Sequence, residues 1–451
     1  MKKIILTGIA VIVLGSTIYA QDIPKLWTLE ECISYATANN INLKQKEQEE
    51  ELGKVELKTS QNSWMPNLNA SLGQNMDFGR TPSRDGTIID QNSINSSFNM
   101  QLNMPLFYGF KIANDIAFRK LNLMAVTESL NKAKDELALN ITSYYLQALY
   151  SKELLNIAEL QVSITKEQLI RTEALINAGK IPVAQLSYIK AQLANDEATL
   201  VEAKSSVSLA LLDLAQALEL ERMGVDFDIV QPETGYVVPD DNISGILPHD
   251  IDDIYNNAVT FKPQIKEQKF LLESQRKLLR IAQADYYPRL NFNANYGNGY
   301  YRYGGNDIES VSFGSQLKQN ERKTIGVNLN IPIFNRFAVK NNVSQVRIGI
   351  INQELAVENS KKTLYKEIQQ AYFMTVTAQA KYLASEKSII ASKEALYYEE
   401  ESYMAGKSSV FEYNESKAKY VQSMSEQAQA KYNFIFRTKI LDFYNGISIT
   451  L

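Results

Sequence analysis

The chain has 451 residues, of which 45% are hydrophobic and 22% are charged, and its formal net charge is −4. This weakly acidic balance does not favour a nucleic-acid partner, because proteins that bind nucleic acids present a basic surface. A single histidine and a single cysteine exclude the common metal centres and nucleophile–histidine triads, so the sequence predicts no catalytic residues, no metal and no cofactor.

Residues 1–20 have the pattern of a secretory signal peptide. Lys2 and Lys3 precede an apolar run, and Ala20 supplies a small residue before Gln21, where cleavage is expected. Beyond this segment no apolar run approaches the ~20 residues that a membrane-spanning helix needs. If the mature chain enters a membrane, it must therefore do so as strands.

A β-hairpin is predicted at about residues 66–105. Apolar and uncharged polar residues alternate strictly along its strands, which suits a strand with one face to lipid and one to water. Aromatic residues near the strand ends resemble the belts that form at membrane interfaces. The same alternation would suit a soluble hairpin packed on a core, but the signal peptide and the Asn-rich polar faces favour lipid.

The strongest signal is a helix from about residue 110 to 176, which contains neither proline nor glycine. Large residues recur seven apart along it and again along 183–220, a pattern that predicts helices packed side by side as in coiled coils. About 67 helical residues span roughly 100 Å, and the segments 41–63 and 183–220 would span roughly 90 Å if stacked end to end. One long helix beside two shorter coaxial helices is therefore expected.

The second half of the chain repeats the first. Three landmarks recur at nearly constant spacing: Pro66 and Pro288, Pro105 and Pro332, Gly179 and Gly406. The first pair is separated by 222 residues (288 − 66) and the other two by 227 (332 − 105 and 406 − 179), so the length changes once, within the hairpin loop. One structural unit is therefore used twice in a pseudo-symmetric body.

This repeat predicts a division of the chain into a signal peptide, two repeats and a connecting segment. The predicted boundaries are 1–20 for the signal peptide, 21–222 for the first repeat (hairpin about 66–105, tip turn about 177–182), 223–250 for the linker, and 251–451 for the second repeat (hairpin about 288–332, tip turn about 404–409).

Four strands cannot close a membrane barrel, because the smallest known barrels have eight. An open sheet edge in lipid would leave backbone groups without hydrogen bonds. Several copies must therefore share one barrel. Three copies would supply twelve strands (3 × 4) and leave a conduit, whereas two copies would give an interior that side chains fill.

The duplicated halves, the Pro-led hairpins and the two helix–Ala-Gly-Lys–helix turns resemble the TolC family of outer-membrane efflux proteins over essentially the whole mature chain. The Ser-Val-Phe-Glu sequence that begins at Ser409 is a more specific match. The resemblance implies an α+β membrane protein: a homotrimer with a shared 12-stranded β-barrel in outer-membrane lipid, continued by a periplasmic α-barrel of long antiparallel coiled-coil helices.

By resemblance, the function is that of a passive exit duct that works with a periplasmic adaptor protein and an inner-membrane pump, in efflux or type I secretion. The rival interpretation is a periplasmic or surface coiled-coil structural protein whose hairpins bind a partner. Fractionation would separate the two, because only a barrel needs detergent to leave the outer membrane.

The resemblance also implies roles for residues at the helical turns. Glu412 and Glu415 match acidic rings near the periplasmic entrance, and Tyr403 matches a gate tyrosine. The residues that match adaptor-docking turns are Gly179, Lys180, Pro182, Gly406, Lys407 and Ser409.

Each of these residues also has a purely structural interpretation. Ser409 and Glu412 have the spacing of a capping box, and a glycine after a helix supplies the left-handed residue that ends it. Tyr403 would equally pack in a helical seam.

Two positions depart from the family pattern. Gln185 stands where an acid is expected, and Ser408 stands where a gate arginine would be. The salt-bridge lock of the family is therefore not expected in this chain.

Overall fold

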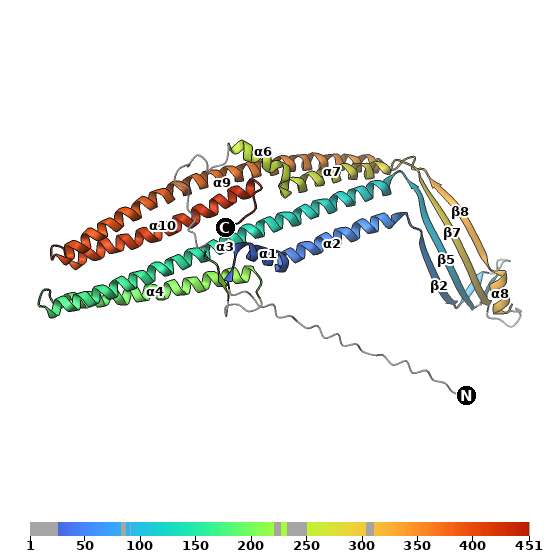
Figure 1. Cartoon of the computed structure of the whole chain (residues 1–451). Helices are drawn as coiled ribbons and strands as arrows, with labels where there is room; N and C mark the ends of the chain where they lie inside the picture. Colours follow the sequence, from blue (N-terminus) through green and yellow to red (C-terminus); the bar gives the residue numbers. More distant parts are fainter. Residues whose placement is uncertain are drawn as a thin grey trace, which may run out of the picture.

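The structure is a computed structural model that describes residues 26–82, 87–90, 92–220, 227–231, 250–303 and 311–450. The predicted signal peptide and most of the predicted linker lie outside the described residues. The chain is elongated, with long helices at one end and a sheet of long strands at the other (Figure 1).

Two helices of 67 residues each, α3 (Lys111–Asn177) and α9 (Ala338–Met404), run through most of the helical part. The heptad prediction for the first of them is confirmed. Shorter helices α2 (Ile41–Gln61) and α4 (Ala184–Ala217) pack along α3 one after the other, as the lengths predicted (Figure 1). Around α9, the corresponding neighbours are α7 (Pro263–Ala284) and α10 (Val410–Tyr444).

Two short helices lie beside the long ones near the middle of the molecule: α1 (Leu29–Asn39) and α6 (Ile251–Phe261). Each packs over a buried apolar cluster, one beneath α1 against α3 and α4, the other beneath α6 against α9 and α10. A parallel pair of two-residue strands, β1 (Leu26–Trp27) and β6 (Asp228–Ile229), closes the first cluster. The cores therefore sit where the short helices thicken the bundle.

The four long strands form one antiparallel sheet in the order β2-β5-β7-β8, which confirms the four predicted strands. Their bounds are Asn67–Asp77, Ser93–Tyr108, Arg289–Tyr303 and Arg322–Asn330, in that order. The smaller elements near the sheet are η1 (Asn62–Trp64), β3 (Arg80–Pro82), β4 (Ile88–Asp90) and α8 (Phe313–Gln319). Strands β2 and β8 are the sheet edges.

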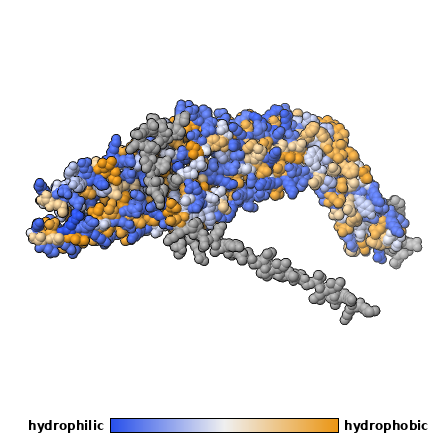
Figure 2. Space-filling view, viewed as in Figure 1, coloured by the Kyte–Doolittle hydropathy of each residue, from blue (hydrophilic) through white to orange (hydrophobic). Residues whose placement is uncertain are grey.

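The register of the sheet separates an apolar face from a polar one. Directly opposed residues share a face. One cross-strand row is Leu68, Leu102, Ala294 and Ile325; the adjacent row, on the other face, is Asn67, Asn103, Asn293 and Gly326. In Figure 2 hydrophobic residues gather over the part of the strands nearest the helices. The separation of apolar and polar rows onto opposite faces is the amphipathic pattern that the alternation predicted.

The junctions between strands and long helices have the same unusual backbone in both halves. Gly109 and Phe110 have φ values of 59° and 63°, and Arg336 and Phe337, each 227 residues further on, have 53° and 60°. Left-handed residues in succession are rare outside glycine. The repeat therefore extends to local backbone conformation.

Gly109→Ala should destabilise the protein. An added Cβ would lie 2.6 Å from the Ala284 carbonyl oxygen and 2.7 Å from the Tyr287 Cβ, and the left-handed backbone alone costs about 1–2 kcal/mol. Thermal melting followed by circular dichroism measures the loss. Gly314→Ala is the control, because its Cβ would meet nothing within 4 Å. Equal melting of the two variants would contradict the close approach.

Candidate periplasmic entrance

The residues that sequence reasoning assigned to function gather at the end of the helices farthest from the sheet. There α3 turns into α4, and α9 turns into α10 (Figure 1). Helices α3 and α10 also contact each other, so the two helical hairpins lie against one another.

Both turns are built around a left-handed glycine, as predicted. Gly179 has a φ of 69° and Gly406 a φ of 71°. Lys180 donates its backbone N–H to the Leu175 carbonyl at 3.0 Å, and Lys407 donates to Ser402 at 2.9 Å. These are the bonds of a Schellman motif, which satisfies the last carbonyls of a helix.

The surface of these turns is open. A Cβ added at Gly179 or Gly406 would meet nothing within 4 Å, so the glycines are required by backbone conformation and not by space. Lys180, Pro182 and Lys407 are all exposed. The six residues assigned to docking therefore form two small, accessible turns, with Ser409 as the N-cap of α10.

The capping-box interpretation of Glu412 is confirmed. Ser409 accepts a hydrogen bond from the Glu412 N–H, and Glu412 accepts one from the Ser409 N–H at 2.8 Å. The bond from the Ser409 backbone lowers the pKa of Glu412 most, followed by those from the Ser409 and Ser408 hydroxyls. The Glu412 carboxylate is therefore anionic and anchored to the turn.

Glu415 lies one turn further along α10 and makes an exposed ion pair with Lys419 at 2.9 Å. Tyr403 stacks on Tyr413, with ring centroids 5.5 Å apart and planes 23° apart. Its hydroxyl is buried without a hydrogen-bond partner. Within one chain, Tyr403 is thus part of the seam between α9 and α10.

The two positions that depart from the family pattern differ in their surroundings. Ser408 donates to the carboxylate of Glu399 and also to Glu412. The side-chain oxygen of Gln185 is buried without a partner. At the position where the family pattern has a gate arginine, this chain therefore has a serine that makes hydrogen bonds to two carboxylates.

A buried ion pair near the helical turns was not predicted. Lys417 on α10 and Asp196 on α4 form an ion pair at 3.2 Å, with side chains only 4% and 2% exposed. The Thr165 hydroxyl on α3 donates to Asp196 and accepts from Lys417. Gln161 and Gln192 both donate to the other Asp196 oxygen, at 2.7 and 2.8 Å.

This network joins the α9–α10 hairpin to the α3–α4 hairpin. Burial lowers the pKa of Lys417, partly offset by the neighbouring Asp196 carboxylate. A sequence signal existed: Asp196 lies three residues after Leu193, and Lys417 four after Tyr413, which are heptad positions. A charge at an apolar seam position commonly fixes register.

A second, exposed link lies nearer the turns. Arg171 on α3 pairs with Glu400 on α9 at 2.7 Å. Gln168 lies between this link and the buried pair, and Thr172 follows Arg171 directly; both side chains are buried without hydrogen-bond partners. The seam between the hairpins near the turns therefore contains buried polar side chains.

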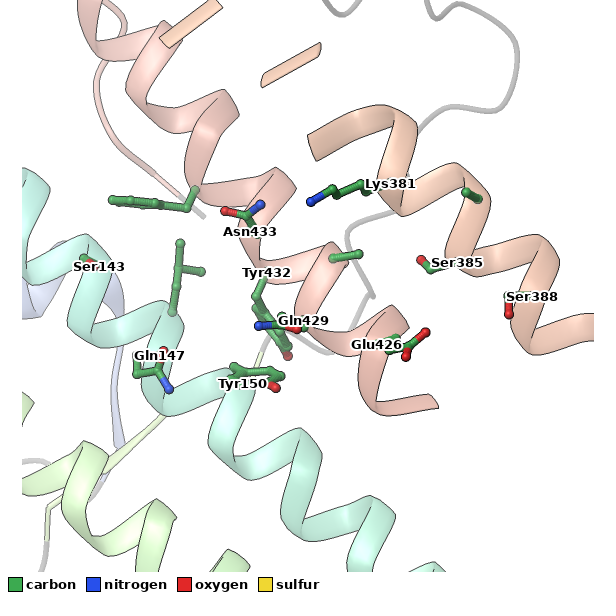
Figure 3. Close-up of a pocket in the computed structure, with 14 residues that line it drawn as sticks. Ser143, Gln147, Tyr150, Lys381, Ser385, Ser388, Glu426, Gln429, Tyr432 and Asn433 are labelled. Carbon is green, nitrogen blue, oxygen red and sulfur yellow. The ribbon is translucent and has the colours of Figure 1, made fainter. Parts of the chain in front are cut away.

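A cavity of about 720 Å³ lies further along the same seam, between α3, α9 and α10 (Figure 3). Tyr150 and Tyr432 line it and make an edge-type ring contact, with centroids 6.4 Å apart and planes 62° apart. Its other polar lining includes Lys381, Glu426 and several amides and serines. The mixture of hydroxyls, amides and two charged side chains makes it a polar groove between helices.

Within the described ranges, no group of three or more His, Cys, Asp or Glu side chains could hold a metal ion. In that same part of the chain, no helix is both long and apolar enough to cross a membrane.

A sequence profile described as "Outer membrane efflux protein" matches residues 32–219 and 254–436, so the chain belongs to that family. Two similar proteins are the outer membrane efflux protein BepC of Brucella suis (19% identical, covering 86% of this chain and 78% of that protein) and the outer membrane protein TolC of Escherichia coli (19%, covering 77% and 69%). The protease secretion protein PrtF of Dickeya chrysanthemi is also 19% identical, covering 96% and 90%.

Solved structures of similar fold include CusC, with a TM-score of 0.76 at 14% identity over 96% of each chain. The CmeC outer membrane channel of Campylobacter jejuni has a TM-score of 0.73 at 17% identity, covering 93% of this chain and 86% of that one.

Family membership decides between the two interpretations of the sequence. The protein is an outer-membrane channel that serves as an exit duct for efflux or secretion, and it is not an enzyme.

Proposed function

We propose that three copies of the chain assemble into one duct, with a shared 12-stranded barrel in the outer membrane and a periplasmic tunnel of helices. The observation that carries this proposal is the pair of open edges, β2 and β8, on a sheet with one continuous apolar face. In lipid those edges must pair with strands, and only neighbouring copies supply strands of matching pattern.

Mass measurement of the purified protein in detergent tests the assembly. Three copies per particle are expected. A stable monomer or dimer would contradict the shared barrel, because neither can both close the sheet and enclose a conduit.

The division of the chain supports the same assembly. In this proposal residues 1–20 direct secretion, 21–222 and 251–451 are the two repeats, and 223–250 is the segment between them. The repeats would give the trimer a pseudo-sixfold arrangement of hairpins.

The proposed partners are a periplasmic adaptor protein and an inner-membrane pump. The accessible turns at Gly179 and Gly406 are the proposed docking points for the adaptor. What supports this choice is their position, since they are the tight turns at the far end of the heptad helices. The substrate would be chosen by the pump and pass through passively.

The carboxylates of Glu412 and Glu415 are proposed to make the entrance cation-selective. Three residues apart on one helix, they lie near each other on its surface, and three copies would place six carboxylates around the opening. Fixed negative charges attract cations and repel anions in a narrow pore. Divalent cations added at the periplasmic side should also block it.

Single-channel recording in asymmetric salt measures this selectivity. Glu415→Gln should weaken selectivity and block more than Glu412→Gln, because Glu412 is held by its capping bonds. Unchanged selectivity in the double variant would mean that both carboxylates face away from the lumen.

A further inference from the structure

The two hairpins have the same register when the repeat offsets are applied. Asn67 pairs with Asn103 in the first hairpin. Adding 222 to the first number and 227 to the second gives Arg289 and Asn330, which pair in the second hairpin. The offsets therefore relate the structures of the halves residue by residue, and not only their sequences.

The contact between the hairpins has no counterpart within one chain. It joins β5, the second strand of the first hairpin, to β7, the first strand of the second. The corresponding contact would join β8 to β2, and these strands lie at opposite edges of the sheet. A β2 strand for β8 must therefore come from another copy.

We propose that β8 pairs antiparallel with β2 of a neighbouring copy, in the register that the offsets carry over from β5–β7. The pair Asn103–Asn293 becomes Asn330 with Ser71 of the neighbour. The pair Leu102–Ala294 becomes Leu329 with the neighbour's Leu72. This inference rests on the shared barrel proposed above and specifies which residues meet at its seam.

The exposure of matching residues supports a second copy at this edge. Leu106 in β5 is 41% exposed, whereas its counterpart Ile333 is 94% exposed. Phe107 is half-buried, whereas Phe334 is 72% exposed. Strand β5 continues through this region because β7 pairs with it, whereas β8 ends before it. A β2 strand from a neighbouring copy would cover Ile333 and Phe334 in the way that β7 covers Leu106 and Phe107 within one chain.

The helices show the same relation. Helix α3 packs against α7. Adding 227 to the residues of α3 gives α9, and subtracting 222 from those of α7 gives α2, so the corresponding contact joins α9 to α2 of the neighbour. In one chain α9 exposes a stripe at Ile348, Ile351 and Leu355, and α2 exposes Leu52 and Val55. Residues three, four or seven apart share one helix face. Each of the two helices that the carried-over contact would join thus exposes apolar side chains in the single chain.

The carried-over register also matches the chemistry of the strands. It places leucine opposite leucine on the apolar face and asparagine opposite serine on the polar face. It further places Arg322 diagonal to the neighbour's Asp77 at the outer end. A slip of one residue would reverse the faces, whereas a slip of two would preserve them. The two-residue slip is therefore the alternative to test.

Cysteine cross-linking of the full-length trimer in detergent distinguishes the registers. Cys32 does not interfere, because it is fully buried and burial raises its thiol pKa to about 12. Opposed strand residues lie at a Cα separation that a disulfide spans, and diagonal neighbours do not. Ser71→Cys/Asn330→Cys and Leu72→Cys/Leu329→Cys report the proposed register. Ser71→Cys/Asn328→Cys reports the slip.

After oxidation with copper–phenanthroline, at least one of the two in-register variants should run on a denaturing gel mainly as a covalent trimer. The slipped variant and each single-cysteine variant should remain monomeric. A covalent trimer from the slipped pair, a covalent dimer from Ser71→Cys alone, or no cross-link at either in-register pair would overturn the inference. Native mass, measured on the same samples, distinguishes these outcomes from failure of the trimer itself.

Discussion

Lys417→Met should lower the free energy of unfolding by about 3–5 kcal/mol, the cost of leaving a buried charge without its partner. The Asp196 carboxylate would stay buried between three helices with its cation removed. Urea unfolding followed by helical circular dichroism in detergent measures the loss. We expect the transition to move to lower urea and the seam between the helical hairpins to open first.

Two variants make this result specific. Lys419→Met removes an exposed lysine only two residues away and should have little effect, since exposed ion pairs contribute little. Asp196→Asn combined with Lys417→Met keeps an acceptor for Gln161 and Gln192 while removing both charges, and should recover most of the stability. Equal loss in the single and double variants would mean that the charges are not coupled.

The pH dependence of stability gives an independent check on Lys417. Because burial lowers its pKa below the ordinary 10.5, the folded protein binds fewer protons than the unfolded chain between the lowered value and 10.5. Stability attributable to this group should therefore rise with pH across that window. In Lys417→Met the rise should be absent, and a rise of the same size would assign it to another group.

Replacing both turn glycines, Gly179→Val with Gly406→Val, should abolish export and leave assembly largely intact. Each valine must adopt a left-handed conformation that costs about 1–2 kcal/mol, and a β-branched side chain makes the turn rearrange. No packed neighbour is disturbed, because a Cβ at either position meets nothing within 4 Å. The change is therefore confined to the proposed docking surface.

Growth on a panel of dyes, detergents and antibiotics measures export, using compounds to which the unaltered protein gives resistance in a deletion strain. Gly314→Val, at the opposite end of the molecule and also in open space, is the matched control. Normal resistance in the double glycine variant, with normal amounts of trimer, would show that the turns are not where the adaptor docks.

The long elements were predictable because their signals are local and repeated. Heptads over many turns gave α3 nearly to the residue, and strict alternation gave all four strands of the sheet. The glycine turns and the capping box were also readable, since each depends on residues within one helical turn.

The buried network near the helical turns was missed for a physical reason. Thr165 and Lys417 are 252 residues apart in sequence, and periodicity within one helix does not identify its partner helix. The pairing of β5 with β7 was likewise beyond the pattern of either hairpin alone. For Tyr403, the sequence left two interpretations open, and the stacking on Tyr413 depends on how α9 meets α10.

The claim that this chain forms a duct is tested most directly by electrical recording. Purified particles of three chains, added in detergent to one side of a planar lipid bilayer, should produce discrete and long-lived conductance steps of uniform size. Folded particles that enter the bilayer and never produce such steps would contradict the account.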